Sequence, residues 1–396
     1  MSINFQNTNR LNALVNLLSG NVLPVTSDGS ELSLLSKLYA ISTWIIILIY
    51  TSGCVIAIFR VSKEYALREC TVNLIIVVEV FFNIFHMYHQ RDLLKRLIDN
   101  YNLLFSMGND LLKTTVVTYI GPVEKMLKFY AITEVCTVVF WVSASLVTVF
   151  QKEEFVHEDY ALPISFSEEP ISRNVYIVNV VVEIFGSGYL IFKKVSADIY
   201  TLHLILSLTS QYKYMKMKFG MIFRRKDNSS KSRYQSDRVI EKELDSLFRH
   251  HSVVVRSTIM LKEILSFNVC VVHLDSVFRF CFLSFMLAMV SFVNMTVNIK
   301  GCIIISYTVA AILQLYMICF YVQELLEMGS ILADDAFHEE WYSCELLVRK
   351  NFRIMIHANK LKCQLAPCQS VDLSLPSFMQ IINQAYSACL LFLKMK

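Results

Sequence analysis

Long apolar runs separated by polar connections dominate this chain. A helix needs about 20 apolar residues to cross a bilayer, and seven runs approach that length. The second run is interrupted by Glu79, Asn83 and His86, and the fourth ends at Lys193-Lys194. The pattern predicts an all-α polytopic membrane protein with seven transmembrane helices. These spans are expected at about 38–59, 71–88, 129–150, 176–192, 276–297, 301–323 and 375–393.

The charges of two loops orient the spans. The 151–175 loop carries six acidic residues against Lys152 and Arg173, whereas the 210–262 segment carries thirteen Lys or Arg against five acids. Basic loops stay in the cytosol, so the acidic loop is predicted outside and the basic segment inside. Counting spans from these loops predicts an inside amino terminus and an outside carboxyl terminus.

This orientation disfavours a G-protein-coupled receptor, which has seven spans but an outside amino terminus. The third span ends in Val149-Phe150-Gln151-Lys152, with no Asp/Glu-Arg-Tyr pattern, and the last span contains no Asn-Pro-x-x-Tyr.

Apolar periodicity continues past the inner ends of the later spans. Ile199, Leu202 and Leu206 prolong the fourth span beyond Lys193-Lys194, which we place at the inner membrane edge. Segments 239–265 and 327–365 show similar helical spacing and offer the partners that an apolar face in water requires. We predict a cytosolic helical bundle formed by extensions of spans 4–7. The alternative is a set of amphipathic helices on the membrane surface. The polar stretch from Arg224 to Lys242 is predicted to be a loop.

Composition supports the membrane assignment. Of 396 residues, 55% are hydrophobic and 18% are charged, with a mean hydropathy of +0.48, whereas soluble domains are about 25% charged. Eleven cysteines are scattered singly, which does not suggest a disulfide framework. Cys363 and Cys368 lack further ligands for zinc, so no metal or other cofactor is expected.

Ionisable residues within the apolar runs are functional candidates, because charge is costly in a membrane. Glu79, Glu134 and Glu183 fall inside predicted spans, and Asn83 or Asn179 are possible partners. Asp275 and Arg279, four residues apart, are predicted to form a structural ion pair.

The last part of the chain resembles the insect odorant receptor family. The resemblance rests on Ala333-Asp-Asp-Ala-Phe337-His-Glu-Glu-Trp341-Tyr342, followed by Arg349-Lys350, then Leu373-Ser-Leu-Pro-Ser-Phe378 and Tyr386-Ser387. It is strongest over 320–396. The related gustatory receptors end differently, and the short inner loop favours an odorant-tuning subunit over the odorant co-receptor.

The resemblance implies an odorant-gated, non-selective cation channel in the plasma membrane of a sensory neuron dendrite. Its expected partners are the odorant co-receptor, in a heterotetramer, a small volatile organic ligand and membrane lipid, and no nucleic acid. The last helix is expected to line the pore, with Tyr386, Cys389 and Leu393 as pore or gate residues; alternatively these side chains pack against neighbouring helices. Phe337, Trp341 and Tyr342 are expected to serve subunit assembly.

In this family the outer halves of spans two, three, four and six enclose the ligand. The corresponding residues here are mostly aromatic or β-branched, which suits an apolar pocket. Trp141 and Tyr307 are the preferred candidates, since each has a polar tip. The full set is Val78, Phe81, Phe82, Phe140, Trp141, Val181, Phe185, Ile304 and Tyr307.

Other classes receive less support. The sequence shows no phosphate-binding loop, His-Glu-x-x-His motif or nucleophile elbow, so an enzyme is not expected. A gustatory-type channel and, less favoured, a transporter remain the alternatives. The chain is thus divided into a cytosolic amino-terminal segment (1–36), spans one to six with their loops (37–326), a cytosolic anchor helix (327–372) and a pore-lining seventh span (373–396).

Overall fold

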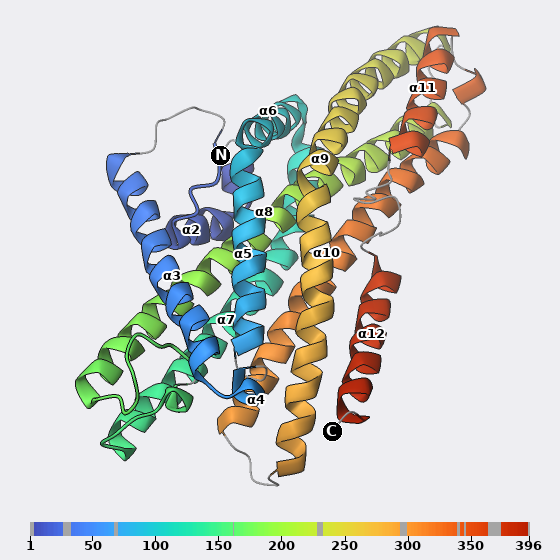
Figure 1. Cartoon of the computed structure of the whole chain (residues 1–396). Helices are drawn as coiled ribbons and strands as arrows, with labels where there is room; N and C mark the ends of the chain where they lie inside the picture. Colours follow the sequence, from blue (N-terminus) through green and yellow to red (C-terminus); the bar gives the residue numbers. More distant parts are fainter. Residues whose placement is uncertain are drawn as a thin grey trace.

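A computed structural model shows an elongated bundle of helices (Figure 1). It describes residues 4–26, 33–66, 70–160, 162–227, 233–293, 299–338, 341–343, 346–362 and 374–394. Within these ranges the only β-type pairing is a single bridge between Phe155 and Ile171. The α-helices are α1 (Phe5–Thr8), α2 (Arg10–Ser19), α3 (Leu34–Arg60), α4 (Lys63–Tyr65), α5 (Thr71–His89), α6 (Arg91–Met107), α7 (Asp110–Gln151), α8 (Arg173–Asp227), α9 (Arg233–Val293), α10 (Ile299–His338), α11 (Leu346–Lys362) and α12 (Leu375–Lys394). Two short 3₁₀ helices are η2 (His157–Asp159) and η3 (Trp341–Ser343).

Six of the described helices are long and apolar enough to cross a membrane: α3, α5, and long parts of α7, α8, α9 and α10. The seventh predicted span is α12, which packs along α9 and α10. Figure 1 places the amino terminus near α6 and the carboxyl terminus at the opposite end of the bundle. The predicted all-α, seven-helix membrane fold is therefore confirmed.

Four helices are far longer than a membrane is thick. α8 has 55 residues and α9 has 61, which at 1.5 Å per residue gives about 83 and 92 Å against a hydrocarbon core of about 30 Å. The predicted bundle of helix extensions is therefore confirmed for spans 4–6, whereas α12, the seventh span, has 20 residues. Two further details differ from the sequence prediction. α7 also starts early, at Asp110, and α9 begins at Arg233, inside the stretch that we predicted to be a loop.

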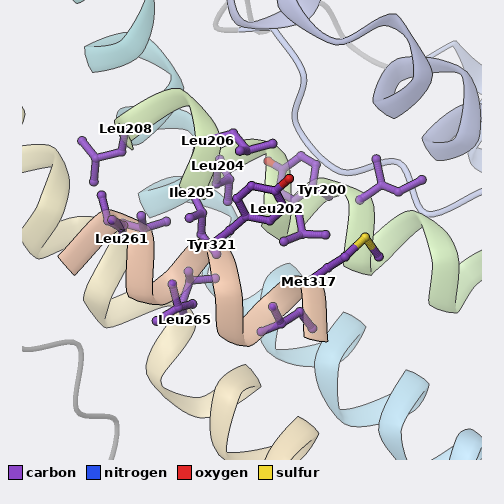
Figure 2. Packing of buried hydrophobic residues seen from close by; sticks show 14 of the residues in the cluster. Tyr200, Leu202, Leu204, Ile205, Leu206, Leu208, Leu261, Leu265, Met317 and Tyr321 are labelled. Atoms are coloured by element: carbon purple, nitrogen blue, oxygen red, sulfur yellow. The ribbon is translucent and has the colours of Figure 1, made fainter. Parts of the chain in front are cut away.

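The core of the extended region forms where α8 is surrounded by other helices. From Ile199 to Tyr212 every residue of α8 is buried, as expected for a helix that is covered on all sides. Figure 2 shows side chains of this stretch, among them Leu202 and Ile205, packed with Leu261 and Leu265 of α9 and Tyr321 of α10. This packing holds α8, α9 and α10 together in the extended region.

The amino-terminal segment is docked on the bundle rather than free. Asn4 and Asn9 cap α1 and α2 by accepting hydrogen bonds from backbone N–H groups three residues on. Gly20 ends α2 with a φ of 67°, a conformation that glycine adopts without strain. The ring of Phe5 stacks on that of His203 in α8, with centroids 4.0 Å apart. The segment thus closes one side of α8.

The acidic loop between α7 and α8 folds back over the bundle end. Phe155 and Tyr160 both stack on Tyr176, with centroids 4.0 and 4.5 Å apart. The Ser165 N–H donates to the carbonyl of Gly53 in α3 at 3.2 Å. A side chain at Gly53 would collide with Phe166, since an added Cβ would lie 2.5 Å from its ring. The loop is therefore a packed cap despite its many exposed acids.

Candidate ligand site and pore helix

A fully buried network of charged and polar side chains occupies the middle of the bundle. Arg279 of α9 lies at its centre and is 1% exposed. Its guanidinium donates to Glu79 Oε2 of α5 at 2.8 Å, to Gln314 Oε1 of α10 at 2.7 Å and to Asp275 Oδ2 at 3.0 Å. The predicted Asp275–Arg279 pair is present, and the carboxylate of Glu79 forms a second ion pair with Arg279.

Lys194 of α8 organises the other half of this network. Its ammonium donates to Glu134 Oε1 of α7 at 2.6 Å and to the Tyr130 hydroxyl at 3.1 Å. Tyr130 in turn donates to Asp198 Oδ2 at 2.6 Å. Gln314 joins the halves, since its amide donates to Glu79 Oε1 at 2.8 Å and to Asp198 Oδ1 at 3.1 Å. Five helices, α5, α7, α8, α9 and α10, thus contribute side chains to one polar network.

Lys193 and Lys194, which we placed at the inner membrane edge, are both buried in the bundle. Lys193 is 0% and Lys194 1% exposed, and their position relative to the membrane stays a prediction. Lys194 is held inside by its two carboxylate neighbours. Lys193 instead reaches Asn21 Oδ1 at 3.3 Å and lies 4.5 Å from the ring centre of Trp44. The residues that decide this, Glu134 and Asn21, are distant in sequence.

Glu183 of α8 belongs to a separate contact near the acidic loop. One of its carboxylate oxygens accepts hydrogen bonds from Ser145 Oγ and from the Leu162 N–H, both at 3.1 Å. Asn179, which we considered as a partner, donates instead to the hydroxyl of Tyr160 at 2.9 Å. The Glu183 carboxylate therefore ties the acidic loop to α7 and α8.

Trp141 of α7 and Tyr307 of α10, the two preferred pocket candidates, lie in contact. Their ring centroids are 5.3 Å apart with an interplanar angle of 36°. Trp141 is partly exposed, whereas Tyr307 is 1% exposed. The buried Tyr307 hydroxyl has no hydrogen-bond partner among the described residues. A buried hydroxyl without a hydrogen-bond partner is costly.

The other seven candidates are placed differently. Ile304 is buried in the core near Tyr307. The remaining six side chains are 44–54% exposed on the surface of the isolated chain. They are Val78 (50%), Phe81 (48%), Phe82 (44%), Phe140 (47%), Val181 (45%) and Phe185 (54%).

The two faces of α12 differ in polarity. Its apolar face, which includes Ile381 and Ala385, is buried against α9 and α10. Cys389 belongs to this buried face at 6% exposure, whereas Tyr386 is 61% exposed. The expected stripe of Tyr386, Cys389 and Leu393 is therefore not a single open surface, and the side chain of Leu393 lies outside the described residues. The open face borders a groove lined by Pro376, Met379, Gln380, Asn383, Gln384 and Ser387.

Comparison with known proteins identifies the family. The model of the family described as "7tm Odorant receptor" matches residues 66–386, most of the chain. The chain belongs to this odorant receptor family. It is 21% identical to Odorant receptor 67c of Drosophila melanogaster over 143 residues, which are 36% of this chain and 34% of that receptor.

Solved structures agree in fold with this odorant receptor. The olfactory receptor OR5 of Machilis hrabei in complex with eugenol has a TM-score of 0.80 at 13% identity, covering 98% of this chain and 97% of the other. A second structure of OR5 has a TM-score of 0.78 at 13% identity with the same coverage. At this identity the likeness establishes the fold of a multi-pass membrane protein.

The three candidate assembly residues of the receptor divide into one partly buried side chain, Trp341, and two exposed ones. The ring of Trp341 stacks on Phe352 of α11 with centroids 6.2 Å apart. Phe352 packs in turn against Phe219 of α8, with ring centroids 5.3 Å apart. Phe337 and Tyr342 are 61% and 63% exposed. Trp341 thus fastens α11 to the extended bundle, while its two neighbours are open to a partner. Cys363 and Cys368, considered above for zinc, lie outside the described residues.

Sequence reasoning missed four members of the central network. Lys194 was interpreted only as a membrane-edge residue, and Tyr130, Asp198 and Gln314 were not singled out. Asp198 follows Lys194 by four residues, which is the spacing of a helical ion pair. That spacing inside an otherwise apolar helix was the available signal.

Proposed function

We propose that this chain is an odorant-tuning subunit of an odorant-gated, non-selective cation channel in the plasma membrane. It assembles with the odorant co-receptor into a heterotetramer, and the open face of α12 lines the pore. The supporting observation is that one face of α12 is apolar and buried, whereas the open groove along the helix contains the polar side chains of Gln380, Asn383, Gln384 and Ser387 beside exposed apolar residues such as Met379. Amide and hydroxyl side chains facing lipid hydrocarbon are costly, so this face requires water or another polar surface.

The proposed pore surface consists of Gln380, Asn383, Gln384 and Ser387. All four side chains line the open groove along α12. Gln380 lies three or four residues before Asn383 and Gln384, and Ser387 lies three or four residues after them, so the four share one side of the helix. Four such helices around an axis would surround a wet passage for cations. This surface replaces Cys389 of the sequence prediction, because Cys389 faces the receptor's own core.

Ligand binding is proposed beside Trp141 and Tyr307. The pair offers aromatic surface and one unpaired hydroxyl at an α7–α10 contact, which is the mixture of apolar area and few polar groups that small-molecule sites show. α10 also contacts α12: the ring of Tyr316 packs against that of Phe378 at 6.0 Å, and Gln323 Oε1 accepts from the Leu375 N–H at 2.9 Å. A shift of α10 on ligand binding would therefore reach the pore helix directly.

Cysteine accessibility in whole-cell recordings tests the pore assignment. The chain is co-expressed with the co-receptor, and Asn383→Cys and Ser387→Cys are compared with Ile381→Cys, which is a buried position on the same helix. A charged thiol reagent should reduce odour-evoked current in the first two variants and leave the third unchanged. The pore assignment would be refuted if the reagent reduced the odour-evoked current equally in all three variants. It would also be refuted if the reagent left the current unchanged in all three.

A further inference from the structure

The central network contains more acidic than basic groups. Its acidic groups are Glu79, Glu134, Asp198 and Asp275, and its basic groups are Lys194 and Arg279, so four acids face two bases. The six side chains are 0–7% exposed. Excess charge of one sign is costly in the interior of a membrane protein. The network therefore favours the approach of an additional positive charge.

Two buried polar atoms beside this excess of negative charge lack a hydrogen-bond partner among the described residues. They are the second carboxylate oxygen of Glu134, Oε2, and the hydroxyl of Tyr307. Leaving a buried polar group without a partner is costly. The Glu134 oxygen is an acceptor, and the hydroxyl both donates and accepts. A ligand that satisfies both must carry a hydrogen-bond donor.

Both atoms lie along the contact between α7 and α10. Glu134 and Trp141 are seven residues apart, so they share one face of α7. Between them, the Thr137 hydroxyl lies 3.4 Å from Ser306 Oγ, next to Tyr307 in α10. The aromatic pair and the open carboxylate oxygen therefore border one site.

We propose that the ligand of this site is a small amine bound as its ammonium ion. The inference rests on the proposed function for the location of the ligand site. The nitrogen donates to Glu134 Oε2 and the Tyr307 hydroxyl, and the apolar part lies against Trp141. An ammonium group supplies both the donors and the positive charge, and aromatic faces attract cations. An alcohol supplies a donor without the charge, and a carbonyl compound supplies neither.

Three ligands of nearly equal size test the proposal: benzylamine, benzyl alcohol and benzaldehyde. Their half-effective concentrations are measured in cells that express the chain with the co-receptor. Their effects on the melting temperature are measured on the purified chain, which reports binding without channel opening. Glu134→Gln keeps the size of the side chain and removes its charge, while Lys194 retains Asp198 at 3.8 Å. Tyr307→Phe removes only the unpaired hydroxyl. Glu124→Gln, on the same helix and paired with Lys128 near the surface, is the matched control.

Benzylamine should be the most potent ligand of the wild-type chain. Its half-effective concentration should rise at least about tenfold in Glu134→Gln, as expected for a lost charged hydrogen bond of about 1.5–3 kcal/mol. Tyr307→Phe should produce a smaller rise, and Glu124→Gln none.

The results separate this inference from the proposed channel. Currents evoked by the alcohol or aldehyde but not by the amine would overturn the amine site and leave the channel function standing. A melting-temperature increase with benzylamine but no current from any ligand would support the amine site and contradict the channel. No benzylamine effect in either assay, or equal potency in wild type, Glu134→Gln and Tyr307→Phe, would overturn the amine site.

Discussion

Replacing Arg279 by methionine should destabilise the chain more than any similar change on the surface of the same helix. The guanidinium donates to Glu79, Asp275 and Gln314 in a fully buried site. Methionine has similar length but no charge, so two buried carboxylates lose their shared cation. Breaking a buried pair by removing one partner costs about 3–5 kcal/mol. For 396 residues, about 4 kcal/mol corresponds to a fall of roughly 5 °C in melting temperature.

Arg249 provides a matched control on α9. It donates to Asp245 Oδ2 at 2.8 Å, with the same i,i+4 spacing as Asp275 and Arg279, but its side chain is 73% exposed. Exposed pairs contribute about 0–1 kcal/mol, so Arg249→Met should change the melting temperature by about 1 °C or less.

Thermal unfolding of the purified chain in detergent, followed by size-exclusion chromatography, measures both variants. Adding Glu79→Gln and Asp275→Asn to Arg279→Met should recover more than half of the lost stability, because the uncompensated charges are then removed. If Arg279→Met melts at the same temperature as Arg249→Met, the reasoning about the buried charge is wrong. A triple variant less stable than the single variant would likewise refute it.

Three further predictions follow from other parts of the structure. Trp141→Ala should alter the odorant tuning profile without loss of surface expression, which a panel of odorants and surface biotinylation together measure; an unchanged profile would contradict its place in the site. Burial lowers the pKa of His157 in the acidic loop below its ordinary value, so its contribution to stability is present at neutral pH and is lost as the pH falls through that lowered pKa. The melting temperature should therefore fall more steeply between pH 7 and 5 in the wild type than in His157→Gln, and parallel curves would exclude this role. Trp341→Ala removes the ring that stacks on Phe352. It should lower the yield of tetramer with the co-receptor on native gels by more than Tyr342→Ala does, since the Tyr342 side chain is exposed. Equal yields from the two variants would argue against an anchoring role for Trp341.

Much of the helical architecture could be predicted from the local sequence. Apolar runs of membrane length indicate spans wherever they occur, because backbone groups in lipid must be paired within the helix. Periodicity beyond Lys194 also indicated the long extension of α8, which the structure confirms. The start of α9 at Arg233 was missed, because the polar stretch there has no apolar stripe. It is nevertheless helical, because it continues a helix that is stabilised by packing further along the chain.

The candidate site was predictable only in part. Trp141 and Tyr307 were singled out by residue type and depth, and they lie together. Phe140 was chosen by the same reasoning, but it lies one residue along the helix and is 47% exposed. Neighbouring helical residues point about 100° apart, so a small error in helix rotation exchanges a pocket residue for one facing lipid.

The two Asp–Arg pairs of α9 separate local from tertiary information. Spacing alone brings Asp245 to Arg249 and Asp275 to Arg279, because residues four apart are neighbours on any helix. Nothing in that spacing distinguishes an exposed pair from a buried one. The distinction comes from Glu79, 200 residues from Arg279 in the chain, and from Gln314 on another helix. Helix length and polarity follow from local sequence, whereas the partners of a buried charge depend on how distant helices cross and rotate against one another.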